Sequence, residues 1–289
     1  NSLINYHITL YIPYSVWTRM KIMTYNIMEG GVRPYQSRLG KVLEVIAQQE
    51  ADVIGLQETK VTKGQKNEFV SAMRRANSYP YDVVFDRDEE WTYGYAAALF
   101  SRITPSSSRL VGERVRAVEM VFPVQIGDLS ISNVYLSHVS ESERLPQVKE
   151  MLQELRGNNH SIIIGDFNAL SPEDNIPQSA VDFFSERMKE KYCKDGKLCF
   201  DTIEAVLKEG YVDVGLQFFA PEQITDKTNL SGGTGIHTRP IRMDFIFAKR
   251  DVLPYVKEFA LVREGLAGTA SDHFPWYILL NESLFPAKF

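Results

Sequence analysis

Short apolar runs alternate with helically spaced apolar residues along the first part of the chain. The run over residues 22–28 is followed by Gly30-Gly31, a pattern typical of a strand that ends in a loop. Apolar residues then recur at helical spacing, which predicts an amphipathic helix through Leu39, Val42, Leu43, Ile46 and Ala47. Residues 52–57, with the sequence D-V-I-G-L-Q, predict a second buried strand.

The rest of the chain continues with elements of the same kinds. Strands are predicted at residues 81–85, 95–100, 115–126, 129–136, 161–165, 243–248 and 276–280. Helices are predicted at residues 68–76 and 143–155, and residues 171–210 are predicted to be helix and loop. The dipeptide Gly127-Asp128 is expected to join the two strands beside it as a hairpin.

No linker, charge block or internal repeat divides the chain. One domain with two packed sheets and helices outside is therefore the economical arrangement. Residues 1–19 are apolar and aromatic, but they form a poor secretory signal because they lack a basic leader and an A-x-A-like site. We expect the functional domain to span residues 20–289, with residues 1–19 as an N-terminal extension or an extra edge strand.

The composition is that of an ordinary globular protein. Hydrophobic residues make up 44% and charged residues 24% of the 289, which excludes a disordered chain. The only cysteines, Cys193 and Cys199, provide neither a disulfide framework nor a zinc motif, and are either two free thiols or one local disulfide. No apolar run approaches the roughly 18 residues of a transmembrane helix. We expect a cytoplasmic monomer, with secretion as the alternative.

The candidates for chemistry are polar residues in or beside the predicted strands. They are Asn26, Glu58, His138, Asp166, Asn168, Asp244, Asp272 and His273. A carboxylate at such a position needs a partner or a role, because strand interiors favour apolar residues. Each residue alone could be a cap, a turn residue or a paired core residue. Open α/β sheets bind ligands beyond their strand ends, so we expect these residues to converge.

Six motifs carry a family resemblance when they are taken in order. They are T-Y-N-I, L-Q-E-T, S-H, G-D-F-N-A, R-M-D-F-I-F and S-D-H-F-P. Together, over about residues 20–280, they resemble the endonuclease/exonuclease/phosphatase superfamily, also called DNase-I-like. The resemblance implies an α/β fold, a four-layer sandwich of two mixed β-sheets packed face to face with helices outside. It also implies divalent-metal-dependent hydrolysis of a phosphate ester by in-line attack of water.

The resemblance further implies a metal site. Glu58 corresponds to the main magnesium ligand, with Asn26 beside it. Asp272 corresponds to a further ligand or to a partner of one. Oxygen donors without cysteine suit a hard cation, so the expected cofactor is Mg²⁺, with Mn²⁺ as a substitute.

The catalytic roles are likewise implied by the resemblance. His273 corresponds to the base side of the site, and Asp244 holds its ring. Asp166 and Asn168 correspond to the groups that orient the attacking water and the phosphoryl oxygens. His138 matches family branches with a histidine there, as a second acid or transition-state stabiliser. Which of Asp166 and His273 accepts the proton is left open at this point.

The substrate is the least determined part of the prediction. The candidate substrate-binding residues are Arg33, Trp91, Tyr93, His237 and Arg242, which are arginines or lie in predicted loops. The net charge is −5 and no basic stripe suits long duplex DNA, so a small or single-stranded phosphodiester, or a phosphatase substrate, is slightly favoured. A nuclease acting on DNA or RNA has almost equal weight, and a non-catalytic binding protein on the same fold is the third alternative.

Overall fold

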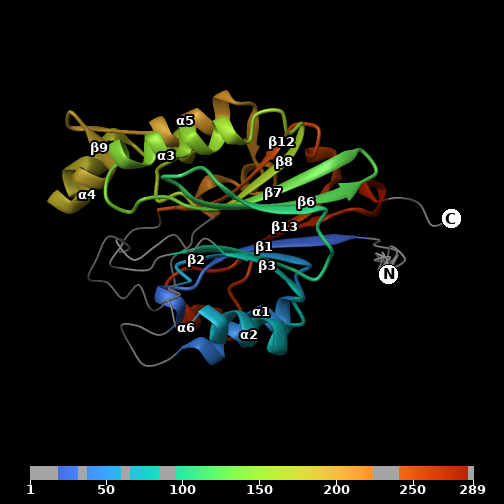
Figure 1. Ribbon diagram of the computed structural model, residues 1–289. Coiled ribbons are helices and arrows are strands. Elements are labelled where there is room, and N and C mark those ends of the chain that lie inside the picture. The colour runs from blue at the N-terminus through green and yellow to red at the C-terminus, as the bar shows by residue number, and fades with distance from the viewer. Residues whose placement is uncertain (1–18, 32–37, 60–65, 85–95, 224–240, 286–289) are drawn as a thin grey trace, which may run out of the picture.

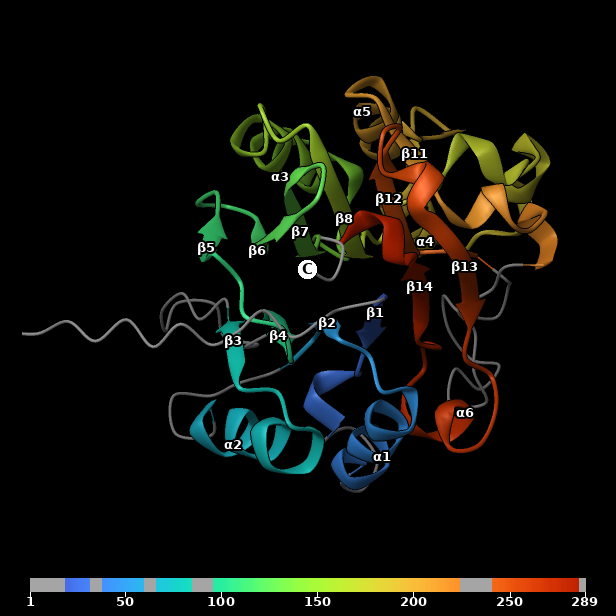
Figure 2. The same cartoon turned by 90° about the vertical axis from the view of Figure 1, so that its right-hand side faces the viewer.

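The computed structural model describes residues 19–31, 38–59, 66–84, 96–223 and 241–285. Two six-stranded sheets lie face to face, and helices cover the outer face of each one (Figure 1). Figure 2 shows the same layers from the side. This is the four-layer α/β sandwich that the sequence resemblance implies.

The first sheet has the strand order β13-β14-β1-β2-β4-β3. Its strands are β1 (Met20–Asn26), β2 (Val53–Gln57), β3 (Tyr81–Val84), β4 (Ala97–Ser101), β13 (Val256–Leu261) and β14 (Trp276–Leu280). The sheet is mixed, because β1 is parallel to β2 and antiparallel to β14. The helices on its outer side are α1 (Leu39–Gln49), α2 (Lys66–Asn77) and the short α6 (Ala267–Ala270).

The second sheet has the strand order β11-β12-β8-β7-β6-β5. Its strands are β5 (Ser107–Val111), β6 (Arg116–Val124), β7 (Gly127–Tyr135), β8 (His160–Asp166), β11 (Tyr211–Asp213) and β12 (Asp244–Lys249). Here β7 and β8 form the parallel pair. The outer layer contains α3 (Glu141–Glu154), α4 (Glu186–Tyr192) and α5 (Asp201–Lys208), with a small hairpin of β9 (Cys193–Lys194) and β10 (Lys197–Leu198).

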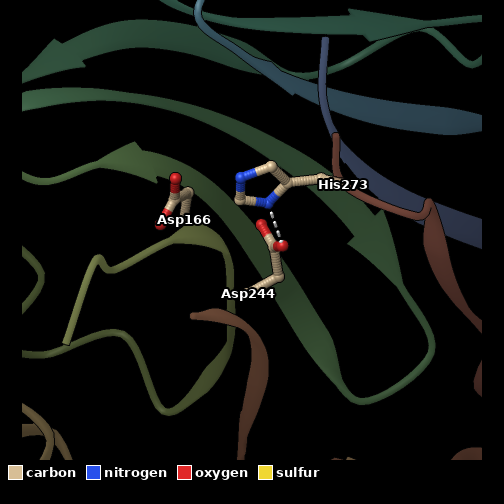
Figure 3. A group of neighbouring side chains, drawn as sticks. All are labelled: Asp166, Asp244 and His273. Carbon is tan, nitrogen blue, oxygen red and sulfur yellow. Dashed lines mark hydrogen bonds and ion pairs between the residues drawn. The ribbon is translucent and has the colours of Figure 1, made fainter. Parts of the chain in front are cut away.

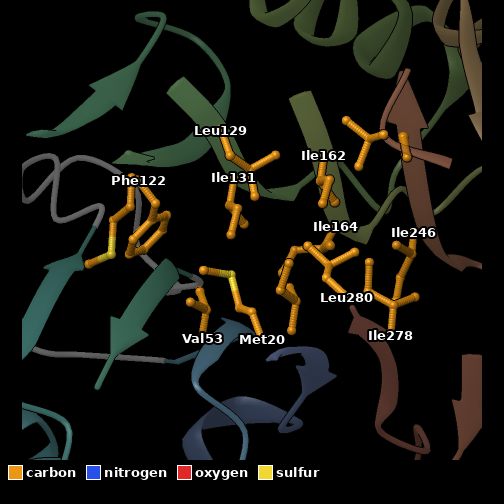
Figure 4. Close-up of a cluster of buried hydrophobic side chains, with 14 of the residues drawn as sticks. Met20, Val53, Phe122, Leu129, Ile131, Ile162, Ile164, Ile246, Ile278 and Leu280 are labelled. Atoms are coloured by element: carbon orange, nitrogen blue, oxygen red, sulfur yellow. The ribbon is translucent and has the colours of Figure 1, made fainter. Parts of the chain in front are cut away.

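The main core lies between the two sheets. Its buried side chains include Met20, Val53, Phe122, Leu129, Ile131, Ile162, Ile164, Ile246, Ile278 and Leu280 (Figure 4). Along β1, Met20 and Ile22 belong to this core, whereas Met23 and Tyr25 pack in the layer under the outer helices. Such strands are apolar on both faces, because alternate side chains point to opposite sides and both sides are covered.

The sequence analysis missed three strands of the two large sheets, β5, β11 and β13, and all three are edge strands. It also missed the two-residue strands β9 and β10. β5 and β13 carry exposed polar side chains, and β11 has only three residues. Edge strands have a weak hydrophobic signal because one side of the strand meets solvent. The hairpin between β6 and β7 is present, but its turn lies at Gln125-Ile126 rather than Gly127-Asp128, since Gly127 already pairs with Val124.

Two further predictions concern the cysteines and the N-terminal extension. Cys193 and Cys199 are free thiols, which settles the alternative between thiols and a local disulfide. The proposed extension at residues 1–19 lies outside the described residues, apart from Arg19. Among the helices that the structure does describe, none is both long and apolar enough to cross a membrane.

Candidate active site

The candidate active site lies where the ends of central strands from both sheets meet. Asn26 is the last residue of β1, and Asp166 is the last residue of β8. The Asn26 Nδ2 atom donates a 2.9 Å hydrogen bond to Asp166 Oδ2, across 140 residues of sequence. One polar contact therefore joins the two sheets at this edge.

Glu58 follows β2 directly and is held at both carboxylate oxygens. Its Oε1 accepts hydrogen bonds from Asn26 Nδ2 and Tyr135 Oη, each 3.2 Å long. Its Oε2 accepts the backbone N–H of Glu29 at 2.9 Å. Burial raises the pKa of Glu58, and the neighbouring negative charge of Asp272 raises it further. This carboxylate is thus preorganised beside a second one that repels it.

Asp166 and Asn168 form a compact turn after β8. The backbone N–H of Asn168 donates to Asp166 Oδ1 at 2.8 Å, and the Asn168 Nδ2 atom donates to the Leu136 carbonyl at 3.2 Å. Burial raises the pKa of Asp166 to about 6, although the positive charges of His273 and Lys191 oppose that shift. An acid with this pKa can exchange a proton near neutral pH.

Close packing of two strands explains the glycine in the G-D-F-N motif. Gly165 pairs with Val134 of β7 and has φ 139°, a conformation that residues with a side chain rarely adopt. A Cβ atom there would lie 2.0 Å from the Val134 carbonyl oxygen. The close approach of β8 to β7 sets the position of Asp166, which is the next residue.

His273 and Asp244 form a buried pair opposite Asp166. The His273 Nδ1 atom lies 2.6 Å from Asp244 Oδ2, and Figure 3 shows the imidazole ring between the two aspartates. Asp244 is also the register partner of Asp166 where β12 pairs with β8. Burial disfavours a charged ring, but Asp244 and Asp272 together raise the pKa of His273 well above its ordinary value. The ring is therefore an imidazolium at neutral pH.

The donor set of the site fits a hard divalent cation. Ligand atoms of Asp166, Asp244 and His273 lie within 4.8 Å of one another, and this buried group could hold a metal ion. Glu58 adds a further carboxylate close to Asp166, because the Asn26 Nδ2 atom donates hydrogen bonds to both acids. The carboxylate oxygens of this group are the donors that Mg²⁺ and Mn²⁺ prefer, whereas the protonated His273 ring would be a neighbour of the cation and not one of its ligands.

Asn26 has an orientation that a direct metal ligand would not have. Its Oδ1 atom accepts the backbone N–H of Met28 at 2.9 Å, so the amide nitrogen faces the acids. Through that nitrogen Asn26 bridges Glu58 and Asp166. The structure therefore gives this residue the task of holding two carboxylates together.

Three of the eight predicted residues, Glu58, His138 and Asp272, are partly exposed, whereas the other five are buried. His138 lies in the loop after β7, and burial lowers its pKa, as do the positive charges of Lys191 and Arg116. The partly exposed members of the set are thus two acids and one imidazole.

Of the five predicted substrate-binding residues, the structure describes Arg242 alone. Arg242 is buried, and its guanidinium forms ion pairs of 2.5 Å with Asp174 and with Asp213. These contacts commit its charge to the protein interior rather than to a phosphate. Arg33, Trp91, Tyr93 and His237 lie outside the described residues.

Two residues of the site were missed by the sequence analysis. Tyr135 is the last residue of β7 and pairs with Asp166, so the rule used for the other strand ends could have found it. Lys191, on α4, donates a 2.7 Å hydrogen bond from Nζ to Asn168 Oδ1. Burial lowers the pKa of Lys191 to about 8. Nothing in K-E-K-Y distinguishes this lysine from a surface lysine.

The sequence matches the model of the Endonuclease/Exonuclease/phosphatase family over residues 23–273. That range includes all eight of the predicted metal and catalytic residues.

Solved structures with the same fold are similar to the chain over most of its length. The 3′ phosphatase NExo from Neisseria, bound to a product DNA hairpin, is 16% identical, with a TM-score of 0.67 over 91% of this chain and 99% of that one. An endonuclease/exonuclease/phosphatase from Beutenbergia cavernae is 17% identical, with a TM-score of 0.67 over 94% and 73%. An AP endonuclease from Archaeoglobus fulgidus is 16% identical, with a TM-score of 0.66 over 90% and 99%. At these identities the likeness concerns the fold.

Proposed function

Because the chain belongs to the endonuclease/exonuclease/phosphatase family, we propose that it is a divalent-metal-dependent hydrolase of phosphate esters. The observation that carries the proposal is the hydrogen bond between Asn26 and Asp166. It joins the strand ends of the two sheets, so that Glu58, Asp166 and the His273–Asp244 pair surround one small volume. A purely structural cluster has no need of three carboxylates gathered at one place.

The partly exposed acids are the best candidates to hold the cation. Burial raises the pKa of Glu58 most, and repulsion by the negative charge of Asp272 raises it further, so a cation between the two acids would relieve that repulsion. Held there, Mg²⁺ or Mn²⁺ would supply positive charge to the phosphoryl oxygens and orient the ester.

The charge states of Asp166 and His273 suit them to different catalytic roles. Asp166, with a pKa of about 6, is ionised at neutral pH and suits the role of proton acceptor for the attacking water. His273 is already protonated, and its Nδ1 atom is occupied by Asp244. It is therefore better suited to stabilise a phosphoryl oxygen by hydrogen bonding through Nε2 than to accept a proton.

Asn168 and His138 complete the proposed site. The Asn168 side-chain amide has a second N–H beyond the one that it donates to the Leu136 carbonyl, and His138 is a partly exposed imidazole whose pKa is lowered. Both suit hydrogen bonding to the phosphoryl oxygens, which gain negative charge in the transition state.

The proposed substrate class is based on the net charge of the protein and on the similar solved structures. A net charge of −5 favours a small or single-stranded phosphodiester, or a phosphomonoester, over long duplex DNA. A nuclease is the second candidate, because the printed titles of similar structures name a 3′ phosphatase with a DNA hairpin and an AP endonuclease.

One assay panel tests the proposal. The purified protein is incubated with Mg²⁺ or Mn²⁺ and bis-p-nitrophenyl phosphate, phosphomonoesters, single-stranded DNA, RNA or plasmid DNA. Hydrolysis that EDTA abolishes is expected, and Glu58→Gln should lower kcat by about a hundredfold, the scale of a lost electrostatic contribution. The exposed acid Glu282 provides the matched control, since Glu282→Gln should leave kcat unchanged.

The results also separate the candidates. Cleavage of DNA or RNA that Glu58→Gln removes would favour the nuclease, and turnover of monoesters alone would favour the phosphatase. An inactive wild-type protein, or full activity in Glu58→Gln, would contradict the proposed function.

A further inference from the structure

A buried lysine stands directly behind the proposed site. Lys191 lies in the last turn of α4 and is 3% exposed. Its Nζ atom donates to Asn168 Oδ1 at 2.7 Å and lies 3.9 Å from the sulfur of Met243. Burying an ammonium group is costly without polar partners, so its placement on one particular amide oxygen is a specific feature of the fold.

The lysine decides which way the Asn168 amide faces. An asparagine amide offers an oxygen acceptor on one branch and two N–H donors on the other, and either branch could take either place. An ammonium group has donors only, so Lys191 must meet the oxygen. The amino group is then on the opposite branch, where the Leu136 carbonyl accepts one of its two N–H groups at 3.2 Å.

The backbone of Asn168 is fixed as well. Its φ is 51°, in the left-handed region, and its N–H donates to Asp166 Oδ1 at 2.8 Å. With the backbone bound to Asp166 and the side chain bound to Lys191 and Leu136, the residue has little freedom to turn. Its side-chain amide is therefore held in one orientation, two residues after the proposed base.

Lys191 is itself anchored by a second buried cation. The Arg144 guanidinium, which is fully buried, donates from Nη2 to the Lys191 carbonyl and from Nη1 to the Ser137 carbonyl at 3.2 Å. Ser137 immediately precedes His138. The helix that carries Lys191 and the loop that carries His138 are therefore tied to one another.

The next residue of α4 reaches the other side of the site. The Tyr192 Oη atom donates to the Met243 sulfur at 3.1 Å, and Met243 precedes Asp244. The end of α4 thus touches the segments that carry Asn168, His138 and Asp244. This arrangement is that of a support for the site, built by a helix outside the two sheets.

We propose that Lys191 is a positioning residue, which orients the Asn168 amide so that one of its N–H donors faces the phosphoryl group of the substrate. The inference rests on the proposed function. It assigns a role to α4 that neither the strand-end motifs nor the metal-binding group contains. Lys191 acts through Asn168 and does not touch the substrate.

The test is a double-mutant cycle on the hydrolysis of bis-p-nitrophenyl phosphate. The variants are Lys191→Met, Asn168→Ala and the double variant. We expect Lys191→Met to lower kcat by about tenfold or more with KM nearly unchanged, because the lost interaction belongs to the transition state. The double variant should be no slower than Asn168→Ala alone, since the lysine has no effect once the amide is absent.

Lys189 offers a matched control on the same helix. It is two residues away, and its ammonium pairs with Glu186 at 2.9 Å near the surface. Lys189→Met should keep wild-type kcat and KM. The thermal unfolding temperature of each variant is recorded alongside the kinetics, so that loss of folding is not taken for loss of function.

A second variant keeps the inference testable if Lys191→Met does not fold. Asn168→Asp retains an acceptor for Lys191 but has no amide N–H donor. We expect it to remain folded with kcat lowered about as much as in Asn168→Ala, and wild-type kcat in Asn168→Asp would overturn the inference.

The outcomes also separate the inference from the proposed function. Wild-type hydrolysis that Glu58→Gln abolishes but Lys191→Met leaves intact overturns the inference alone. Additive losses in the double variant overturn it as well, because they assign Lys191 a role independent of Asn168. A wild-type protein without hydrolytic activity overturns both.

Discussion

Two residues of the site, Glu58 and Asn168, adopt left-handed backbone conformations one and two residues after buried strands. Their φ values are 55° and 51°. Left-handed geometry is unfavourable for residues other than glycine, although asparagine tolerates it best, and such strain tends to occur where function fixes a side chain. At both positions the turn is held by hydrogen bonds from backbone N–H groups to Glu58 and Asp166. The chain bends sharply where each polar side chain leaves its sheet.

The His273–Asp244 pair predicts a particular pH dependence of stability. The pKa of His273 is raised above its unfolded value, so the pair contributes its full stabilisation below the ordinary imidazole pKa and loses it as the pH rises through the folded value. In buffer with EDTA, wild type should therefore exceed His273→Gln in free energy of unfolding most at about pH 6, the lower side of that transition. Urea titrations at pH 6 and pH 9 measure this difference. A difference that grows with pH would contradict the assignment of a charged His273.

At the scale of elements, the site depends on helices and turns that pack outside the sheets. Arg242 lies two residues before β12 and pairs with Asp213 at the end of β11 and with Asp174 in the 3₁₀ turn Pro172–Asp174. It therefore links that turn to two strand ends of the second sheet. Arg242 therefore has a structural role here, whereas the sequence analysis predicted that it contacts phosphate.

Replacing Arg242 tests that structural role. Arg242→Met would leave two buried carboxylates without their cation, so we expect a loss of about 3–5 kcal/mol in the free energy of unfolding. Chemical denaturation of the two proteins measures the loss. A direct role in substrate binding would instead raise KM while leaving the stability near that of wild type.

At the scale of the whole molecule, the two sheets share one functional edge. Asn26 comes from one sheet and Asp166 from the other, while Asp244 begins β12 of the second sheet and His273 lies in the loop before β14 of the first. The site is therefore complete only when both sheets are packed together. Part of the negative charge that gives the net value of −5 is concentrated at that edge, because several acids lie together there.

This acidic edge predicts that a divalent cation stabilises the fold. A cation that binds the native state but not the unfolded chain raises the unfolding temperature by mass action. We expect the unfolding temperature to rise in millimolar MgCl₂ relative to NaCl of equal ionic strength, and to rise less in Glu58→Gln. Differential scanning calorimetry measures both shifts. Equal shifts in the two salts would contradict a specific site.

The central elements could be predicted because their signal is local. β1, β2, β8 and β12 are buried on both faces and therefore appear as apolar runs in the sequence, and β14 is an apolar run with one face only partly buried. The edge strands β5, β11 and β13 were missed because half of each meets solvent or because the strand is short. The hairpin turn was misplaced by two residues because a glycine signals positive φ, and Gly127 has it within the strand.

The sequence by itself determined the order of the strands' polar ends and, through its motifs, the family. Those features depend on residue type and position along the chain, which a sequence contains completely. Only the tertiary structure decided that Arg242 is buried between two aspartates, that Asn26 bridges two acids through its nitrogen, and that Tyr135 and Lys191 belong to the site. The reason is physical: a lysine costs little on a helix surface and needs a partner once packing excludes water, and packing is a property of residues far apart in the chain.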